Sequence, residues 1–252
     1  MRLAVIILTK NEADNIARVV QNVRQVSEEV IVIDSGSTDG TVEKAKQNGA
    51  QVYYRAWDED FAAQRNYGLE MTTADWVLYV DADERLNEEA VTEIKAIVRA
   101  GKNQQYRIKR KVTAFGHTFN YGVLGSEYVT RLFPRGSVKW VGKVHEHAEC
   151  GLSVGTIGGV MEHNTYRSYK QYEEKMQHYS GLWAREKYER GVRVSSITPI
   201  IHASLGFIKM YVIKLGFLDG LQGLYTCLNY AQYEMMKYLK LQELQSSTTP
   251  PL

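Results

Sequence analysis

Short apolar runs alternate with stretches of helical periodicity over the first hundred residues, and this alternation constrains the fold more than any other feature. Leu3–Leu8 is a continuous apolar run, as expected for a strand buried on both faces of a sheet. Residues 12–26 then carry apolar side chains at helical spacing. The same reasoning predicts strands at Val30–Ile33, Val52–Tyr54 and Trp76–Val80, and helices at 41–48, 61–71 and 88–98. Such a chain is predicted to form an α/β fold, with a parallel sheet covered by helices on both faces.

The pattern changes after Gly101. Short β-like runs at Tyr106–Val112, Tyr128–Phe133 and Val138–Val141 predict an antiparallel or mixed layer that completes the sheet. Helical periodicity returns at Tyr169–Tyr188, and a long apolar stretch begins at Pro199. We therefore predict a first domain over 1–165, a helical extension over 166–245 and a disordered tail over 246–252.

Composition excludes some classes of protein. The net charge of +2 argues neither for nor against a nucleic-acid partner, but no Arg-rich recognition stretch occurs and such a partner is not expected. Cys150 and Cys227 match neither a zinc spacing nor a disulfide framework, which favours a reducing compartment. The apolar run near Met1 ends at Lys10 without a cleavage site, so we interpret it as a core strand and expect a cytoplasmic protein.

Asp81 and Asp83 follow the apolar run Trp76–Val80 directly. Side chains at i and i+2 of a strand point the same way, so the two carboxylates are expected to lie together. Ligands of parallel sheets bind outside the carboxyl ends of the strands. The pair could hold Mg²⁺ or Mn²⁺, which prefer oxygen ligands and leave positions for phosphate oxygens. The alternative is a solvated turn.

Polar loops follow the first two strands. Thr9, Asn11 and Glu12 stand where they could bind a base and ribose, although they could equally cap the next helix. Residues 34–41 form a turn cluster in which Asp34 is favoured as a ligand contact, and the rest could serve helix capping alone. The loop has no Lys after its second glycine, so it is not a Walker loop.

These three elements together resemble the family 2 glycosyltransferases, which have the GT-A fold. The three matching segments are Thr9–Glu12, Asp34–Thr41 and Asp81–Asp83. A fourth segment, Ala62–Gly68, also resembles a helix of that family. The resemblance implies a Rossmann-like mixed sheet flanked by helices, here with a C-terminal helical extension. Arg131-Leu132-Phe133 and Val144-His145-Glu146 further resemble the bacterial lipopolysaccharide inner-core β-glucosyltransferases.

The resemblance implies an inverting hexosyltransferase that moves a sugar from a UDP-sugar to a lipopolysaccharide core or other cell-surface glycan. Glucose is the sugar that the resemblance favours. The resemblance also implies Asp81 and Asp83 as metal residues, Glu146 as the base, and donor contacts from Thr9, Asn11, Glu12, Asp34, Arg65 and Asp81. Glu146 could instead belong to a solvated strand end and Arg65 to a solvated helix face, and His145 or His163 could be a further metal or diphosphate ligand. The other classes considered are a sugar nucleotidyltransferase, disfavoured because residues 9–12 contain no glycine, and a non-catalytic scaffold.

The apolar stretch Ile200–Phe217 is long enough to suggest a membrane span, but His202, Lys209 and Lys214 interrupt it. Aromatic residues interleaved with lysines favour helices that lie in a membrane interface. The alternative is a helical pair that packs on the domain or dimerises. We therefore expect a peripheral protein on the inner face of the cell membrane, acting on a lipid-linked or glycan acceptor.

Overall fold

The computed structural model describes residues 1–143 and 146–246, which form two compact units. The first unit consists of Met1–Arg110 and Glu127–His163, and the second of Lys111–Ser126 and Asn164–Leu252. The second unit thus includes residues 111–126, which the sequence had placed in the first domain. Residues 247–252 of the predicted disordered tail lie outside the described residues, and Ser246 ends the last helix.

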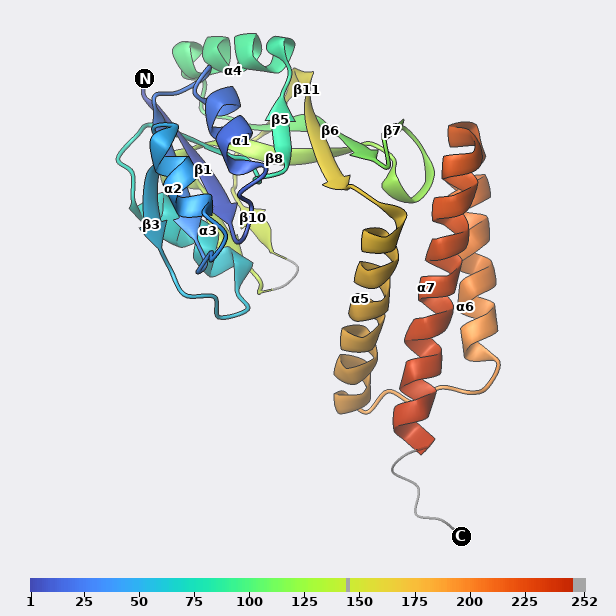
Figure 1. Cartoon of the computed structure of the whole chain (residues 1–252). Helices are drawn as coiled ribbons and strands as arrows, with labels where there is room; N and C mark the ends of the chain where they lie inside the picture. The colour runs from blue at the N-terminus through green and yellow to red at the C-terminus, as the bar shows by residue number, and fades with distance from the viewer. Residues whose placement is uncertain (144–145, 247–252) are drawn as a thin grey trace. The chain divides into compact units, whose positions relative to one another are not determined.

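The first unit is built on the predicted parallel strands (Figure 1). Strand β1 (Leu3–Thr9) lies between β2 (Glu29–Asp34) and β4 (Trp76–Tyr79), and β3 (Gln51–Tyr54) lies outside β2. All three pairings are parallel, and the register places Thr9 beside Asp34. The carboxyl ends of β1 and β2 therefore meet at one edge of the sheet.

Antiparallel strands extend this sheet. Beyond β4 the order continues with β8 (Glu127–Pro134), β6 (Gln105–Ala114), β11 (Val154–Tyr166) and β5 (Glu84–Leu86), and β7 (His117–Phe119) pairs with β6. Strands β9 (Lys139–Val141) and β10 (His147–Glu149) form a separate antiparallel pair. The mixed sheet flanked by helices is the GT-A type of architecture that the sequence predicted.

Side chains of β1 alternate between two cores. Val5 and Ile7 pack in a cluster with helices α1 (Ile16–Val23), α2 (Thr41–Gln47) and α4 (Glu88–Ala100). Ala4 and Ile6 pack on the other face with α3 (Phe61–Glu70). Each large aliphatic side chain buried in this way contributes about 1.5–3 kcal/mol to stability. The alternation keeps the sheet covered on both faces and leaves its carboxyl edge for polar residues.

The second unit is mainly helical (Figure 1). It contains α5 (Tyr169–Glu189), α6 (Thr198–Phe207), the π-helix η3 (Ile208–Ile213) and α7 (Gly220–Ser246), with short 3₁₀ turns at η1 (Gly122–Leu124) and η4 (Gly216–Asp219). Helix α7 packs against both α5 and α6. No single described helix is long and apolar enough to cross a bilayer; Thr198–Ile213 and Gly216–Ser246, bent by 71° at their junction, meet the length and composition requirement only as a pair.

Candidate active site

A cavity of about 410 Å³ opens at the carboxyl edge of the parallel strands. Its lining comes from the ends of β1 and β4, helix α3 and the segment before β10. The residues that line it are Leu8, Thr9, Lys10, Glu12, Ser35, Trp57, Phe61, Gln64, Arg65, Asp81, Ala82, Asp83 and Glu146. The fold thus gathers most of the predicted site residues in one place.

Asn11 and Asp34 do not line this cavity. Asp34 is buried and its Oδ2 accepts hydrogen bonds from the backbone N–H groups of Gly36 and Ser37, at 2.9 and 3.0 Å. Asn11 has a φ of 55°, and its Oδ1 accepts a hydrogen bond of 2.9 Å from the N–H of Thr38. In this structure both side chains order the loops at the strand ends. Their contacts with a nucleotide-sugar donor remain predictions.

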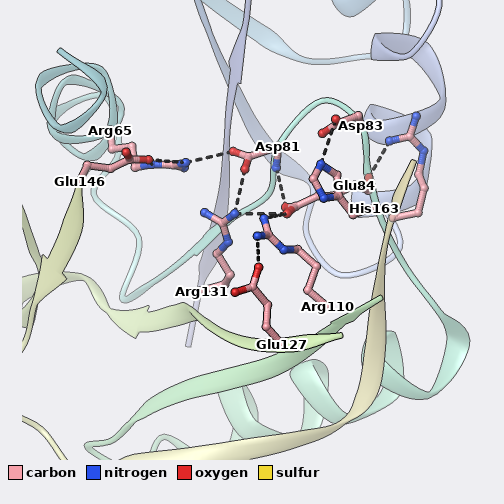
Figure 2. Close-up of polar contacts among 10 residues, drawn as sticks. Arg65, Asp81, Asp83, Glu84, Arg110, Glu127, Arg131, Glu146 and His163 are labelled. Atoms are coloured by element: carbon pink, nitrogen blue, oxygen red, sulfur yellow. Dashed lines mark hydrogen bonds and ion pairs between the residues drawn. The ribbon is translucent and has the colours of Figure 1, made fainter. Parts of the chain in front are cut away.

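Two arginines hold Asp81 (Figure 2). Nη2 of Arg65 lies 3.1 Å from Oδ1, and Nη2 of Arg131 lies 2.8 Å from Oδ2. Burial alone would raise the pKa of Asp81, but the charges of Arg131 and Arg65 outweigh it and hold the pKa well below its usual value. Asp81 is therefore an anion whose two oxygens are both already paired.

Asp81 and Asp83 face different partners, contrary to the expectation from strand alternation. Strand β4 ends at Tyr79, and residues 81–84 form a turn in which the N–H of Glu84 donates to the carbonyl of Asp81 at 3.0 Å. Asp83 turns to His163 of β11, whose Nε2 lies 3.0 Å from Oδ2 of Asp83. The other ring nitrogen, Nδ1, is buried without a hydrogen-bond partner among the described residues.

Glu84 is a central residue of the site that the sequence analysis missed. Its side chain is fully buried, and its Oε2 accepts a hydrogen bond of 2.9 Å from the N–H of Asp81. Its Oε1 lies 3.2 Å from a guanidinium nitrogen of both Arg110 and Arg131. Arg110 also pairs with Glu127 (Figure 2). A third acidic residue directly after Asp81-Ala82-Asp83 was the available signal.

Arg65 connects Asp81 to Glu146. Its Nε and Nη2 lie 3.3 and 3.2 Å from Oε1 of Glu146, and its guanidinium lies 4.7 Å from the centre of the Trp140 ring. Arg65 is only 4% exposed, so it does not belong to a solvated helix face. Its Nη1 is buried without a partner among the described residues, so Asp81 and Glu146 do not use all the hydrogen-bond donors of this guanidinium.

Trp57 and Phe61 form an aromatic wall that the sequence analysis also missed. Both residues line the cavity, and their ring centres lie 4.6 Å apart in an edge-to-face arrangement. Thr9 lines the same cavity, and its hydroxyl is buried without a partner among the described residues. Aromatic faces with a nearby unsatisfied polar group suit a planar heterocycle that carries hydrogen-bonding groups.

The side chains that could coordinate a divalent cation fit such an ion only in part. Among residues 1–143 and 146–246 no group of three or more His, Cys, Asp or Glu side chains converges as a metal site. Asp83 and His163 supply one carboxylate and one imidazole that already face each other. Asp81 is less suited, because a guanidinium occupies each of its oxygens. His145, the other candidate, lies outside the described residues.

The mixed sheet flanked by helices, with a polar cavity at the carboxyl ends of its parallel strands, agrees with the GT-A fold expected from the sequence, and so do the comparisons with known proteins. Residues 4–124 match the family described as "Glycosyl transferase family 2". Residues 4–124 therefore carry a family 2 glycosyltransferase domain.

Relatives span most of the chain. An uncharacterized glycosyltransferase of Rickettsia typhi (strain ATCC VR-144 / Wilmington) is 29% identical over 96% of this chain and 87% of its own length. The glycosyltransferase SunS of Bacillus subtilis (strain 168) is 31% identical over 56% of this chain and 33% of its own. The crystal structure of S. aureus TarS 1-349 in complex with UDP is similar in fold, with a TM-score of 0.50 and 16% identity over 100% of this chain and 93% of that one.

Proposed function

We propose that the enzyme transfers a sugar from a UDP-sugar, with UDP-glucose as the first donor to test, to a lipopolysaccharide core or another cell-surface glycan with inversion at the anomeric carbon. The observation that carries the proposal is the cavity in which Arg65 joins Asp81 to Glu146. The glucose donor and the surface-glycan acceptor follow from the resemblance of Arg131–Phe133 and Val144–Glu146 to the inner-core β-glucosyltransferases.

The donor proposal is supported by the chemistry of the cavity. Trp57 and Phe61 offer aromatic faces for a uracil ring, and Thr9, whose hydroxyl has no partner among the described residues, lines the same cavity. Arg65 offers an unpartnered Nη1 for diphosphate oxygens. TarS, a protein of similar fold, was solved with UDP, which makes UDP the natural first ligand.

A divalent cation such as Mg²⁺ or Mn²⁺ is part of the proposal, with Asp83 and His163 as the residues that would hold it. When bound, such an ion offsets the charge that develops on the diphosphate leaving group. The role of Asp81 then differs from the metal role implied by the resemblance. Its carboxylate forms ion pairs with Arg65 and Arg131 and so fixes the position of both guanidinium groups.

Glu146 is the proposed general base. In an inverting transfer the acceptor oxygen bonds to the anomeric carbon while the bond to the diphosphate oxygen breaks, and the acceptor hydroxyl loses its proton to a carboxylate. Both hydrogen bonds that Glu146 accepts from Arg65 go to Oε1, so the carboxylate is oriented by a buried cation. Neither step requires a Ser or Cys nucleophile.

Two alternatives are weaker. The family 2 match favours glycosyl transfer over a sugar nucleotidyltransferase. A non-catalytic scaffold would have no chemical need for Asp83, Glu146 and Arg65 to line one cavity.

The test is titration calorimetry of purified protein with UDP and UDP-glucose, in Mn²⁺ and in EDTA. We expect metal-dependent binding in the wild type and its loss in Asp83→Ala. The matched control is Asp58→Ala, because Asp58 is exposed and neither it nor its ion-pair partner Arg55 lines the cavity. Absence of binding to any UDP compound in the wild type contradicts the donor proposal; UDP binding without transfer from any UDP-sugar favours the scaffold.

A further inference from the structure

An apolar stripe runs along the outer face of α6 and η3 in the second unit. Its members are exposed and recur every three or four residues, which places them on one side of the helix. They are Ile197, Ile201, Leu205, Ile208 and Val212, and we call them the α6 stripe. The opposite side of α6 is the packed one: Ala203 and Gly206 are buried, and Gly206 lies against Tyr230 and Glu234 of α7. The stripe therefore remains outside the helical core.

The turn between η3 and α7 continues this apolar surface. Its exposed members are Ile213, Leu215, Phe217, Leu218 and Leu221, which we call the hairpin tip. Ile213 is 69% and Leu221 is 75% exposed. Glycines form the inner side of the turn, where a larger residue has no room. A Cβ on Gly216 would lie 2.6 Å from Sγ of Cys227, and a Cβ on Gly223 would lie 2.0 Å from the carbonyl oxygen of Gly216. Close packing of the backbone on the inside thus directs the large side chains outward.

The charged side chains of residues 190–218 all have one sign, and one of them, Arg190, pairs with Glu186 of α5. Residues 190–218 contain Arg190, Arg193, Lys209 and Lys214 but no Asp or Glu. Lys209 and Lys214 are exposed, and in the part of the chain that the structure describes neither ammonium group has an ion-pair partner. The next acidic residue, Asp219, is buried and accepts hydrogen bonds from the N–H groups of Asn120 and Tyr121. The surface is therefore both apolar and cationic.

We infer that the α6 stripe and the hairpin tip dock on an anionic lipid bilayer. The apolar side chains enter the interfacial region while Lys209 and Lys214 reach the lipid headgroups. A second copy of the chain fits less well, because an isologous contact pairs a patch with itself and would bring these lysines against their like charges. Docking of this kind would hold the enzyme on the inner face of the cell membrane, near a lipid-linked acceptor. The inference stands on the second unit alone and is independent of the proposed donor.

The experiment is flotation of the full chain with phosphatidylcholine vesicles, with and without phosphatidylglycerol. We expect binding to the anionic vesicles that weakens in high salt. Replacing exposed leucines by Leu205→Gln and Leu221→Gln should weaken binding about tenfold or more per leucine. Replacing the lysines by Lys209→Gln and Lys214→Gln should weaken binding to anionic vesicles about fivefold per lysine.

The matched control is Leu182→Gln, which removes an exposed leucine of α5 outside the surface and should bind vesicles like the wild type. Circular dichroism and UDP titration of the same samples report folding and the donor site separately. The inference is overturned if the wild type does not bind vesicles that contain phosphatidylglycerol. It is also overturned if the Leu205→Gln and Leu221→Gln variants bind these vesicles as tightly as the control. A dimer in light scattering that becomes monomeric in Leu205→Gln would instead assign the surface to a second copy.

Discussion

Nη2 of Arg131 lies 2.8 Å from Oδ2 of Asp81. This contact, together with the one from Arg65 to the other carboxylate oxygen, makes Asp81 the centre of a chain of charges that ends at Glu146 (Figure 2). The first carboxylate of the Asp81–Asp83 motif therefore organises the cavity, and the second carboxylate, paired with His163, is the one suited to a cation.

Removal of the Arg131 guanidinium should strongly destabilise the first unit. In Arg131→Met, Asp81 keeps only Arg65 and the fully buried Glu84 keeps only Arg110, so the loss should approach the about 3–5 kcal/mol typical of breaking a buried ion pair. The measurement is the free energy of unfolding in urea. The control is Arg107→Met, whose exposed guanidinium stacks on Tyr128 and should cost about 0.5–1 kcal/mol. Equal losses in the two variants would contradict a structural role for the Arg131–Asp81 pair.

The stability of the wild type should fall in acid partly through Asp81. Its pKa in the folded protein is depressed, so its stabilising contribution is present above the unfolded pKa of about 3.9 and is lost as the pH falls through the folded pKa. Asp81→Asn lacks this contribution. The difference in unfolding free energy between wild type and Asp81→Asn should therefore shrink as the pH is lowered below about 4. A difference that stays constant through acid would show that Asp81 is not held ionised by the arginines.

Substitution of the base should separate catalysis from binding. Glu146→Gln keeps the shape of the side chain but cannot take a proton, so kcat should fall by about 10²–10⁴ while the KM for the UDP-sugar changes little. The measurement is initial-rate kinetics of sugar transfer. Glu149→Gln, an exposed glutamate on β10, is the control and should retain the wild-type kcat. A full loss of UDP-sugar binding in Glu146→Gln would assign Glu146 to the donor site instead.

His163 should affect the metal dependence of the enzyme. His163→Ala removes the imidazole that faces Asp83, and the Mn²⁺ concentration needed for half-maximal activity should rise by at least about tenfold. His147→Ala, an exposed histidine on β10, should leave that concentration unchanged. Direct Mn²⁺ titration followed by electron paramagnetic resonance checks the same prediction without substrate. Unchanged Mn²⁺ affinity would remove His163 from the proposed cation site.

Local sequence patterns predicted the order and type of the elements in the first hundred residues, except for the three-residue strand β5 (Glu84–Leu86), which they missed. A buried parallel strand needs a continuous apolar run, and a covering helix needs apolar residues at helical spacing, so both leave a local trace. The boundaries were less well predicted: the first helix spans Ile16–Val23 rather than residues 12–26, because Asn11 adopts a left-handed backbone and the polar residues after it form a turn.

Site residues near the strand ends were predicted from their position, whereas Arg65 and Glu146, which also line the cavity, were predicted only through the resemblance to a known family. Thr9, Asp81 and Asp83 come straight after strands, and the carboxyl ends of parallel strands meet in space. Asp34 has the same position, yet its oxygens bind the neighbouring backbone N–H groups, because a short side chain in a tight turn competes for local donors.

The sequence by itself therefore determined the α/β architecture, the edge of the sheet that carries polar residues, and the resemblance to family 2 glycosyltransferases. Only the tertiary structure decided which charges meet. Asp83 pairs with a histidine 80 positions away, Arg65 with a glutamate 81 positions away, and Glu84 is neutralised by arginines from two other strands. Such pairs depend on strand register and on the shared burial of opposite charges, and neither leaves a periodic signal along the chain.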